Sequence, residues 1–476
     1  MDRTMQDRLT AQLGEMVLTG DAVLPYCRDW IGDVQSSALA VLRPRTTAQV
    51  QDCVRVAAAL GLGIVPQGGN TGLVLGAMPD APDRQVVVSL ERMTAIRNLA
   101  PNDFAIEVEA GAILQDIKDA AAQVGLYFPL SLGAQGSCRI GGNVSTNAGG
   151  INVLRYGMTR ELVLGLEVVL PNGSLFAGLS SLRKDNRGID LKQLFIGAEG
   201  TLGIVTAVTL KLVPAPTAIA TALVALDDLE GAIALYRHAR RDCCDLLSAF
   251  EFMPPLAFTL AREAMPDLPL PMDPGHPAYA LIEMSGSGLV DVDDLMARFL
   301  ERALEGRLAR DGVVAQSRAQ AANLWAIREG MNLGQVQRGR HLRTDISVPL
   351  SQLATFVSEA EAAVADVLPG AVCVSYGHVG DGNVHLNVLP GPGADADIQI
   401  ARAKTAIDAA LDRHAGSISA EHGIGRLKRA AFEARLPPAQ ARLLQAIRQA
   451  VDPEGIMNPG CQITPRPATS GSVQGA

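Results

Sequence analysis

Several features that would place this chain in a specialised class are missing. No apolar run approaches the ~18 residues that a membrane-spanning helix needs. The seven cysteines include no CxxC pair, which argues against a zinc ribbon, an iron–sulfur site or a disulfide framework and favours a reducing compartment. The N-terminal stretch MDRTMQDRLTAQLGEM has no apolar core, so no signal or transit peptide is predicted. We therefore expect a cytoplasmic protein without an integral membrane segment.

Positive charge and the common nucleotide-binding signatures are also lacking. Lys and Arg number 41 against 50 Asp and Glu, a net charge of −9, which does not suit a nucleic-acid-binding protein. Neither GxGxxG nor GxxxxGK[ST] occurs, which argues against a Rossmann NAD site and against an NTPase. The 476 residues, 48% of them hydrophobic, suffice for two or three domains with substantial cores.

The order of predicted elements is that of an α/β protein. A strand, a helix and a strand follow one another from Ala38, and Thr46 with Gln49 forms a capping box at the start of the helix. Pro214 and Pro216 interrupt a strand pattern and mark a domain boundary, beyond which a second α/β or α+β domain is expected. Strands are predicted at 86–90, 106–109, 164–170, 204–213, 278–284, 372–376 and 384–389, and helices at 229–240, 290–304, 353–368, 400–414 and 438–451.

Glycine is abundant, with 47 residues, and it gathers in three loops. The first is Pro66-Gln-Gly-Gly-Asn-Thr-Gly-Leu73, the second is 133–150 with six glycines in eighteen residues, and the third is Gly197-Ala-Glu-Gly-Thr-Leu-Gly-Ile204. Successive glycines let backbone N–H groups converge on an anion such as a pyrophosphate. A stretch of such small residues cannot pack a core, so a large ligand is predicted to supply the missing contacts. A plain turn stays the alternative for the first loop, and a flexible linker for the second.

Histidine is scarce, and its distribution is informative. Three of the seven histidines lie in two short glycine-containing segments, His378-Val-Gly-Asp-Gly-Asn-Val-His385 and Glu421-His422-Gly-Ile-Gly. Two imidazoles across a turn, with a carboxylate and a third imidazole, have the composition of an open N/O site for a divalent metal. A structural role for each histidine is the alternative, and Asp381 is interpreted as a turn residue.

The sequence resembles the flavin-dependent vanillyl-alcohol-oxidase-like superfamily, and within it the D-2-hydroxyglutarate dehydrogenases of the D-2-hydroxyacid dehydrogenase branch. The stretches that carry the resemblance run in the family's order from about Ala38 to Gly460 and include PQGGNTG, LSLGAQGSCRIGGNVSTNAGGINVLRYG, LFIGAEGTLGI, LLSAFEFM, YGHVGDGNVHLNV, SAEHGIGRLKR and DPEGIMNPG.

The resemblance implies a fold and a flavin. It implies an α/β (α+β) chain with a two-subdomain FAD-binding domain over 1–215, an α+β cap domain for substrate and metal over 216–450, and a segment returning to the first domain over 451–465. Residues 466–476 are predicted to be a disordered tail. The FAD is expected to be noncovalent, because Asn70 stands in the loop where some relatives attach the flavin through histidine. The implied cofactor contacts are Pro66, Gly68, Gly69, Asn70, Thr71, Gly72, Leu73, Leu132, Gly133, Gly136, Ser137, Gly142, Asn143, Ser145, Thr146, Asn147, Gly150, Glu199, Gly203, Ile204 and Asn458.

The resemblance also implies roles in catalysis. His378, His385 and Glu421 would hold the metal, most plausibly Zn²⁺, and His422 would be the general base while a hydride passes to flavin N5. The implied substrate contacts are Arg328, Asn332, Arg343 and Asn387. Arg343 replaces the family's usual Lys and Asn332 replaces its Thr, which puts the preferred chain length of the substrate in doubt.

The function expected is oxidation of D-2-hydroxyglutarate, a small-molecule diacid, to 2-oxoglutarate. The alternatives are a D-lactate or broad D-2-hydroxyacid dehydrogenase and a noncatalytic flavin-binding subunit of a larger complex. The sequence leaves open the electron acceptor, the preference for D-malate or D-lactate, and the oligomeric state, of which a homodimer is one option.

Overall fold

The chain divides into two compact units, which a computed structural model describes over residues 3–393 and 395–464. The first unit contains residues 1–150, 157–215 and those from 421 onward, and the second contains 151–156 and 216–420. The chain crosses between units beside Pro214 and Pro216, and it returns at Glu421, thirty residues before the position 451 expected from the sequence. Predictions for residues 466–476 fall outside the described part of the chain.

The first unit contains a small, mostly parallel sheet in the order β1-β2-β4-β3, made of Val17–Leu18, Ala40–Leu42, Gln85–Ser89 and Gly63–Gln67. β2, β3 and β4 run parallel, as a strand–helix–strand crossover requires. The predicted helix is α2, Thr47–Ala59; the N–H of Gln49 donates to the Thr46 hydroxyl at 3.2 Å, and the Gln49 side chain accepts from the N–H of Arg45. The capping box therefore closes one residue earlier than the standard pattern.

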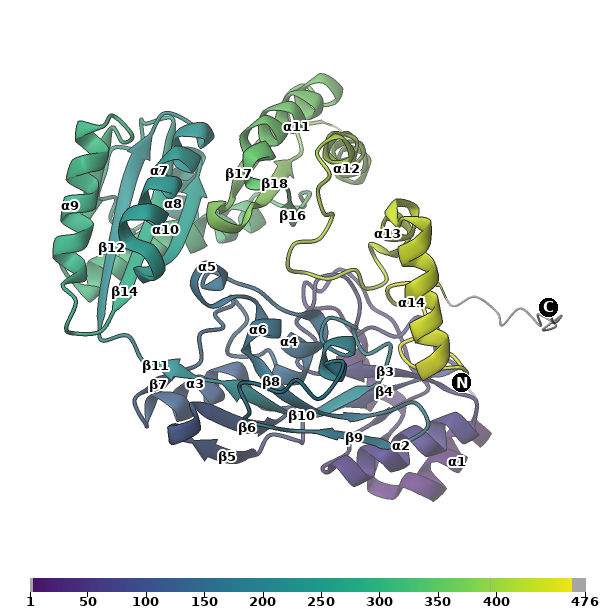
Figure 1. Ribbon diagram of the computed structural model, residues 1–476. Coiled ribbons are helices and arrows are strands. Elements are labelled where there is room, and N and C mark those ends of the chain that lie inside the picture. The colour runs from purple at the N-terminus through teal and green to yellow at the C-terminus, as the bar shows by residue number, and fades with distance from the viewer. Residues whose placement is uncertain (1–2, 394, 465–476) are drawn as a thin grey trace, which may run out of the picture. The chain divides into compact units, whose positions relative to one another are not determined.

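A second, antiparallel sheet of the first unit has the order β5-β6-β10-β8-β9. Its strands are Ile96–Ala100, Ala105–Glu109, Ile204–Lys211, Val163–Val169 and Leu175–Gly178. A further ladder joins β7, Leu126–Tyr127, to β11, Val213–Pro214. The remaining helices of this unit are α1, Arg3–Leu13; α3, Leu114–Ala122; α4, Ile140–Thr146; α6, Thr159–Leu162; α13, Arg429–Arg435; and α14, Pro438–Val451 (Figure 1).

The second unit is a single antiparallel sheet with helices on both faces (Figure 1). Its strand order is β15-β12-β14-β13-β17-β18-β16. In that order the strands are Asp311–Val314, Ala218–Leu226, Ala278–Gly286, Leu247–Met253, Val372–His378, Asn383–Leu389 and Ile346–Ser347. The short helix α5, Val153–Tyr156, belongs to this unit, and the Arg155 guanidinium donates to the carbonyl and the hydroxyl of Ser285.

Four helices cover one face of this sheet and two cover the other. α7, Leu229–Cys243; α9, Val292–Glu305; α11, Leu353–Val367; and α12, Ala396–Arg413, pack on the first face. α8, Leu256–Ala264, and α10, Arg318–Gln337, pack on the second. A Cβ added at Gly334 of α10 would lie 2.1 Å from the carbonyl oxygen of Leu260, so the two helices pack in direct backbone contact. This close packing holds α10 against the sheet.

Among the described helices, none has both the length and the apolar composition that crossing a bilayer requires.

Candidate active site

The three glycine loops meet within the first unit. A Cβ at Gly69 would lie 2.3 Å from the carbonyl oxygen of Ser137, which means that the first and second loops touch at the backbone. The N–H of Glu199 in the third loop donates to the carbonyl of Ser145 at 2.7 Å. A Cβ at Gly200 would approach Pro66 to 2.9 Å. Glycine is therefore used here for close approach between loops as well as for access by a ligand.

Space for a ligand remains beside these contacts. A cleft of about 550 Å³ opens at the carboxyl ends of β2, β3 and β4, where ligands bind in open parallel sheets, and it is lined by Gly68, Gly69, Asn70 and Ser137, among others. Added Cβ atoms at Gly72, Gly133, Gly136 and Gly142 would meet no atom within 4 Å. The buried Oδ1 of Asn143 accepts no hydrogen bond within the described part of the chain. These features fit a large polar ligand such as a dinucleotide.

Several side chains expected to contact the cofactor are engaged by the protein itself. The hydroxyls of Ser145 and Thr146 donate to carbonyls one turn back in α4, and Asn147 accepts from the N–H of Arg160. Asn70, with φ +52°, donates to the carbonyl of Arg28 at 2.8 Å. These side chains shape the loops and leave backbone groups to meet a ligand. Thr71, Leu73, Leu132, Gly150, Gly203 and Ile204 lie in the same loops or at the strand that follows them.

Glu199 connects the third loop to the returning C-terminal segment. Its carboxylate is buried and accepts from the N–H groups of Ile424 and Gly425 at 2.8 and 2.7 Å. Asn458 donates to the carbonyl of Glu199 at 2.7 Å. Both residues were expected at the cofactor, and in the structure their side chains fix the segment that follows His422.

The second unit gathers polar side chains on the sheet face that packs against α10. Because strand side chains alternate, Phe250 and Phe252 enter the core under α7 and α11, and Glu251 points to the opposite face. The same alternation puts three residues of β17 and β18 on the face of Glu251: His378, His385 and Asn387. Glu251 pairs directly with His378, and Tyr376 pairs directly with His385. His385 and Asn387 therefore share one face of β18.

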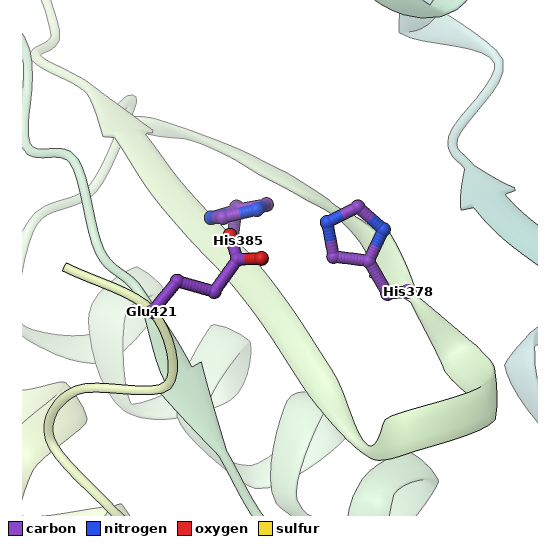
Figure 2. A group of neighbouring side chains, drawn as sticks. All are labelled: His378, His385 and Glu421. Atoms are coloured by element: carbon purple, nitrogen blue, oxygen red, sulfur yellow. The ribbon is translucent and has the colours of Figure 1, made fainter. Parts of the chain in front are cut away.

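Each histidine of this face has its Nδ1 engaged by the protein. Nδ1 of His378 lies 2.5 Å from Oε1 of Glu251, and Nδ1 of His385 lies 3.1 Å from the carbonyl oxygen of Thr344. Both partners are acceptors, which fixes a proton on Nδ1 and leaves Nε2 as the lone-pair nitrogen. Figure 2 shows that Nε2 of His378, the ring nitrogen that is not bonded to Glu251, is directed toward His385 and Glu421.

Glu421 completes a group of three donors. It follows Ala420, the last residue of the second unit, whose N–H donates to the carbonyl of Asp345 beside β16. One ligand atom from each of His378, His385 and Glu421 lies within 4.8 Å of the others (Figure 2). Two oriented imidazoles and a carboxylate fit a divalent metal with open positions. Asp381 stays in the turn, where it accepts from the N–H of Asn383, and His422 is half-buried next to Glu421.

Glu251 was not predicted as a site residue, although it is central to this face. It is 1% exposed, and its second oxygen accepts from Nε of Arg328 at 2.9 Å. Burial alone would raise the pKa of this carboxyl, but the charge of Arg328 and the hydrogen bonds from His378 and Arg328 lower it below its usual range. A single acid inside the apolar run LLSAFEFM was the available signal, since unpaired carboxylates are seldom buried.

The four predicted substrate contacts differ in their surroundings. Arg328 is 6% exposed, and its guanidinium carbon lies 4.7 Å from the centre of the Tyr376 ring. Arg343 is exposed, and its Nε donates to Nε2 of His341 at 3.2 Å. Asn387 is buried and is hydrogen-bonded to Thr344, Gln335 and Tyr376. Asn332 is exposed on α10. The structure thus offers two guanidinium groups, one rigid and one at the surface.

Comparison with known proteins agrees with this arrangement. Residues 38–177 match the model of an FAD-binding domain, and residues 215–461 match that of the C-terminal domain of FAD-linked oxidases. The chain belongs to the FAD-linked oxidase family. It is an FAD-dependent oxidoreductase, and the predicted fold class, a flavin domain followed by a C-terminal α+β domain, is confirmed.

Three curated relatives of this FAD-linked oxidase are named as D-2-hydroxyglutarate dehydrogenases. The chain is 39% identical to a probable mitochondrial D-2-hydroxyglutarate dehydrogenase of Oryza sativa subsp. indica, over 90% of this chain and 76% of that one. It is 37% identical to the mitochondrial D-2-hydroxyglutarate dehydrogenase of Bos taurus, over 94% and 80%. It is 36% identical to the D-2-hydroxyglutarate dehydrogenase of Stutzerimonas stutzeri strain A1501, over 94% and 96%.

Solved structures share the fold of this oxidase at low identity. A p-cresol methylhydroxylase with bound substrate aligns with TM-score 0.75 and 17% identity over 97% of both chains. An alkyldihydroxyacetonephosphate synthase aligns with TM-score 0.73 and 15% identity, over 96% of this chain and 85% of the other.

Removing the Glu199 carboxylate should loosen the segment that carries Glu421 and His422. Glu199→Ala leaves the N–H groups of Ile424 and Gly425 without their acceptor, at a cost of about 1–3 kcal/mol for the buried group of Gly425 and less for the half-buried group of Ile424. We expect faster amide hydrogen exchange at Ile424 and Gly425 and a lower unfolding midpoint. Glu454→Ala, at an exposed position of the same returning segment, is the control. Unchanged exchange at both amides would contradict this anchoring role.

Proposed function

We propose that this oxidase is an FAD- and divalent-metal-dependent dehydrogenase that converts D-2-hydroxyglutarate to 2-oxoglutarate. The observation that carries the proposal is the donor group of His378, His385 and Glu421, since one possible ligand atom from each residue lies within 4.8 Å of the others. The names of the curated relatives support the substrate, and two guanidinium groups in the second unit support a diacid.

The chain's own residues would divide the work as follows. When bound, the metal supplies Lewis-acid activation of the substrate hydroxyl, and FAD supplies the oxidising power. His378, His385 and Glu421 hold the metal, and His422 accepts the hydroxyl proton at an imidazole nitrogen as general base. The position of His422 directly after a metal ligand ties the base to the site through the chain itself.

A diacid substrate needs a cation for its distal carboxylate. By strand alternation, Arg343 lies on the same sheet face as His385, because Leu342 and Ile346 on either side of it enter the opposite core. Arg328 reaches this face from α10. We propose that these two groups bind the distal carboxylate, with Asn387 holding Thr344 and Gln335 in place.

The predicted attachment of FAD, the identity of the metal and the cellular compartment also belong to this proposal. Noncovalent FAD is favoured by Asn70, whose side chain is an amide bonded to the protein, and Zn²⁺ is favoured by the N/N/O donor set. The cytoplasm is kept as the proposed compartment, although the plant and mammalian relatives are named mitochondrial. The donor group disfavours a noncatalytic flavin-binding subunit, and a broad D-2-hydroxyacid dehydrogenase is the second candidate.

Anaerobic reduction of the bound flavin tests the proposed reaction. D-2-hydroxyglutarate should bleach the flavin absorbance in the stopped flow, whereas L-2-hydroxyglutarate should not. Prior treatment with a chelator should abolish the bleaching and leave FAD bound, and added Zn²⁺ should restore it. Full-rate bleaching by the chelated protein would contradict the metal role, and no bleaching by any D-2-hydroxy acid would contradict the reaction.

Substitution of Arg343 tests the diacid preference. Arg343→Ala should lower kcat/KM for D-2-hydroxyglutarate by roughly 10- to 150-fold, the value of one charge-assisted hydrogen bond, and leave D-lactate oxidation nearly unchanged. Arg340→Ala, which removes an exposed guanidinium paired with Asp397, is the matched control and should change neither substrate. Equal losses for both substrates in Arg343→Ala would favour the broad D-2-hydroxyacid dehydrogenase.

A further inference from the structure

We propose that Glu251 is a positioning residue that fixes both a metal-binding imidazole and the cation that recognises the substrate's distal carboxylate. The two oxygens of one carboxylate are used separately, Oε1 for Nδ1 of His378 and Oε2 for Nε of Arg328. This inference rests on the proposed function, because it assigns Glu251 to the proposed metal and substrate sites.

The strand register gives Glu251 its place beside His378. Glu251 of β13 and His378 of β17 are directly paired across neighbouring antiparallel strands. Side chains paired in this way stand about 4.5–5.5 Å apart at Cβ, which suits a hydrogen bond between a carboxylate and a ring. The bond keeps the proton on Nδ1 and orients Nε2 of His378 toward His385 and Glu421 (Figure 2).

The other oxygen restrains Arg328. The guanidinium is held at its edge by the Nε hydrogen bond to Glu251 and at its face by Tyr376, 4.7 Å from the ring centre. With Nε engaged, the two terminal nitrogens of Arg328 form the fork that can bind a carboxylate.

The carboxylate cannot be replaced by an amide of the same shape. Both of its partners donate hydrogen, and Gln has one acceptor oxygen and one NH₂ group. Glu251→Gln therefore keeps at most one of the two contacts and places a donor against the other partner. It also leaves Arg328 buried without its counter-charge.

A matched control lies on the neighbouring strand. Glu283 of β14 is also largely enclosed, and burial raises the pKa of its carboxyl. Its carboxylate accepts from Nε1 of Trp325 and from the hydroxyl of Ser248. Glu283→Gln removes an enclosed carboxylate from the same sheet without altering the proposed site.

The test is a Zn²⁺ titration of metal-free, FAD-loaded protein in competition with a chromogenic chelator, followed by steady-state kinetics. Glu251→Gln should weaken Zn²⁺ binding about 10- to 100-fold and raise KM for D-2-hydroxyglutarate more than KM for D-lactate. Glu251→Asp, which keeps the charge, should recover part of both losses. Glu283→Gln should bind Zn²⁺ as the wild type does.

The outcomes separate this inference from the proposed function. Wild-type protein that binds no Zn²⁺ contradicts the metal role in the proposed function, and this inference with it. Wild type that binds Zn²⁺, with Glu251→Gln binding it equally well, contradicts only the positioning role. Equal losses of Zn²⁺ affinity in Glu251→Gln and Glu283→Gln would indicate a general packing effect and would also contradict the positioning role of Glu251. If Glu251→Gln fails to fold, Glu251→Asp takes its place in the titration. It should bind Zn²⁺ more weakly than the wild type, and equal binding would contradict the positioning role.

Discussion

A carboxylate without access to water has to be paired with donors of hydrogen or positive charge, and the second unit is organised around one such carboxylate. Glu251 lies in the middle of the seven-stranded sheet, and its partners come from β17 and α10. The pairing needs β13 and β17 in the register that sets Glu251 opposite His378, and it needs α10 close to the sheet. The backbone contact of Gly334 in α10 with Leu260 in α8 keeps that helix in place.

The first unit contributes a second buried carboxylate with a related task. Glu199 binds the N–H groups of Ile424 and Gly425, while Ala420 is bound to Asp345 at the end of the second unit. Only Glu421, His422 and Gly423 lie between these anchors. The proposed metal ligand and general base therefore occupy a short stretch of chain that is hydrogen-bonded at both ends.

The sequence predicted those parts whose signal is local. The capped helix at Thr46, the strands flanking the glycine loops, and the placement of His378 and His385 on either side of a turn all follow from short patterns, and the structure contains them. β12 and α10 were not predicted, because Ala218–Leu226 does not alternate between apolar and polar residues and α10 buries glycine and polar residues among its apolar ones. Glu251 was missed since its partners, His378 and Arg328, are 127 and 77 residues away, and the return at Glu421 depends on contacts of Glu199 that no local pattern displays.

The proposed reaction depends most on His378, His385 and Glu421 acting together as a metal site that binds the substrate. X-ray absorption at the zinc edge of the reconstituted, FAD-loaded enzyme tests this directly. We expect a shell of N and O atoms at about 2.0–2.2 Å from the zinc, with scattering from two imidazoles, and additional oxygen ligands when D-2-hydroxyglutarate is added without an electron acceptor. A shell that contains sulfur, that has no imidazole scattering, or that is unchanged by the substrate would contradict the proposed metal site.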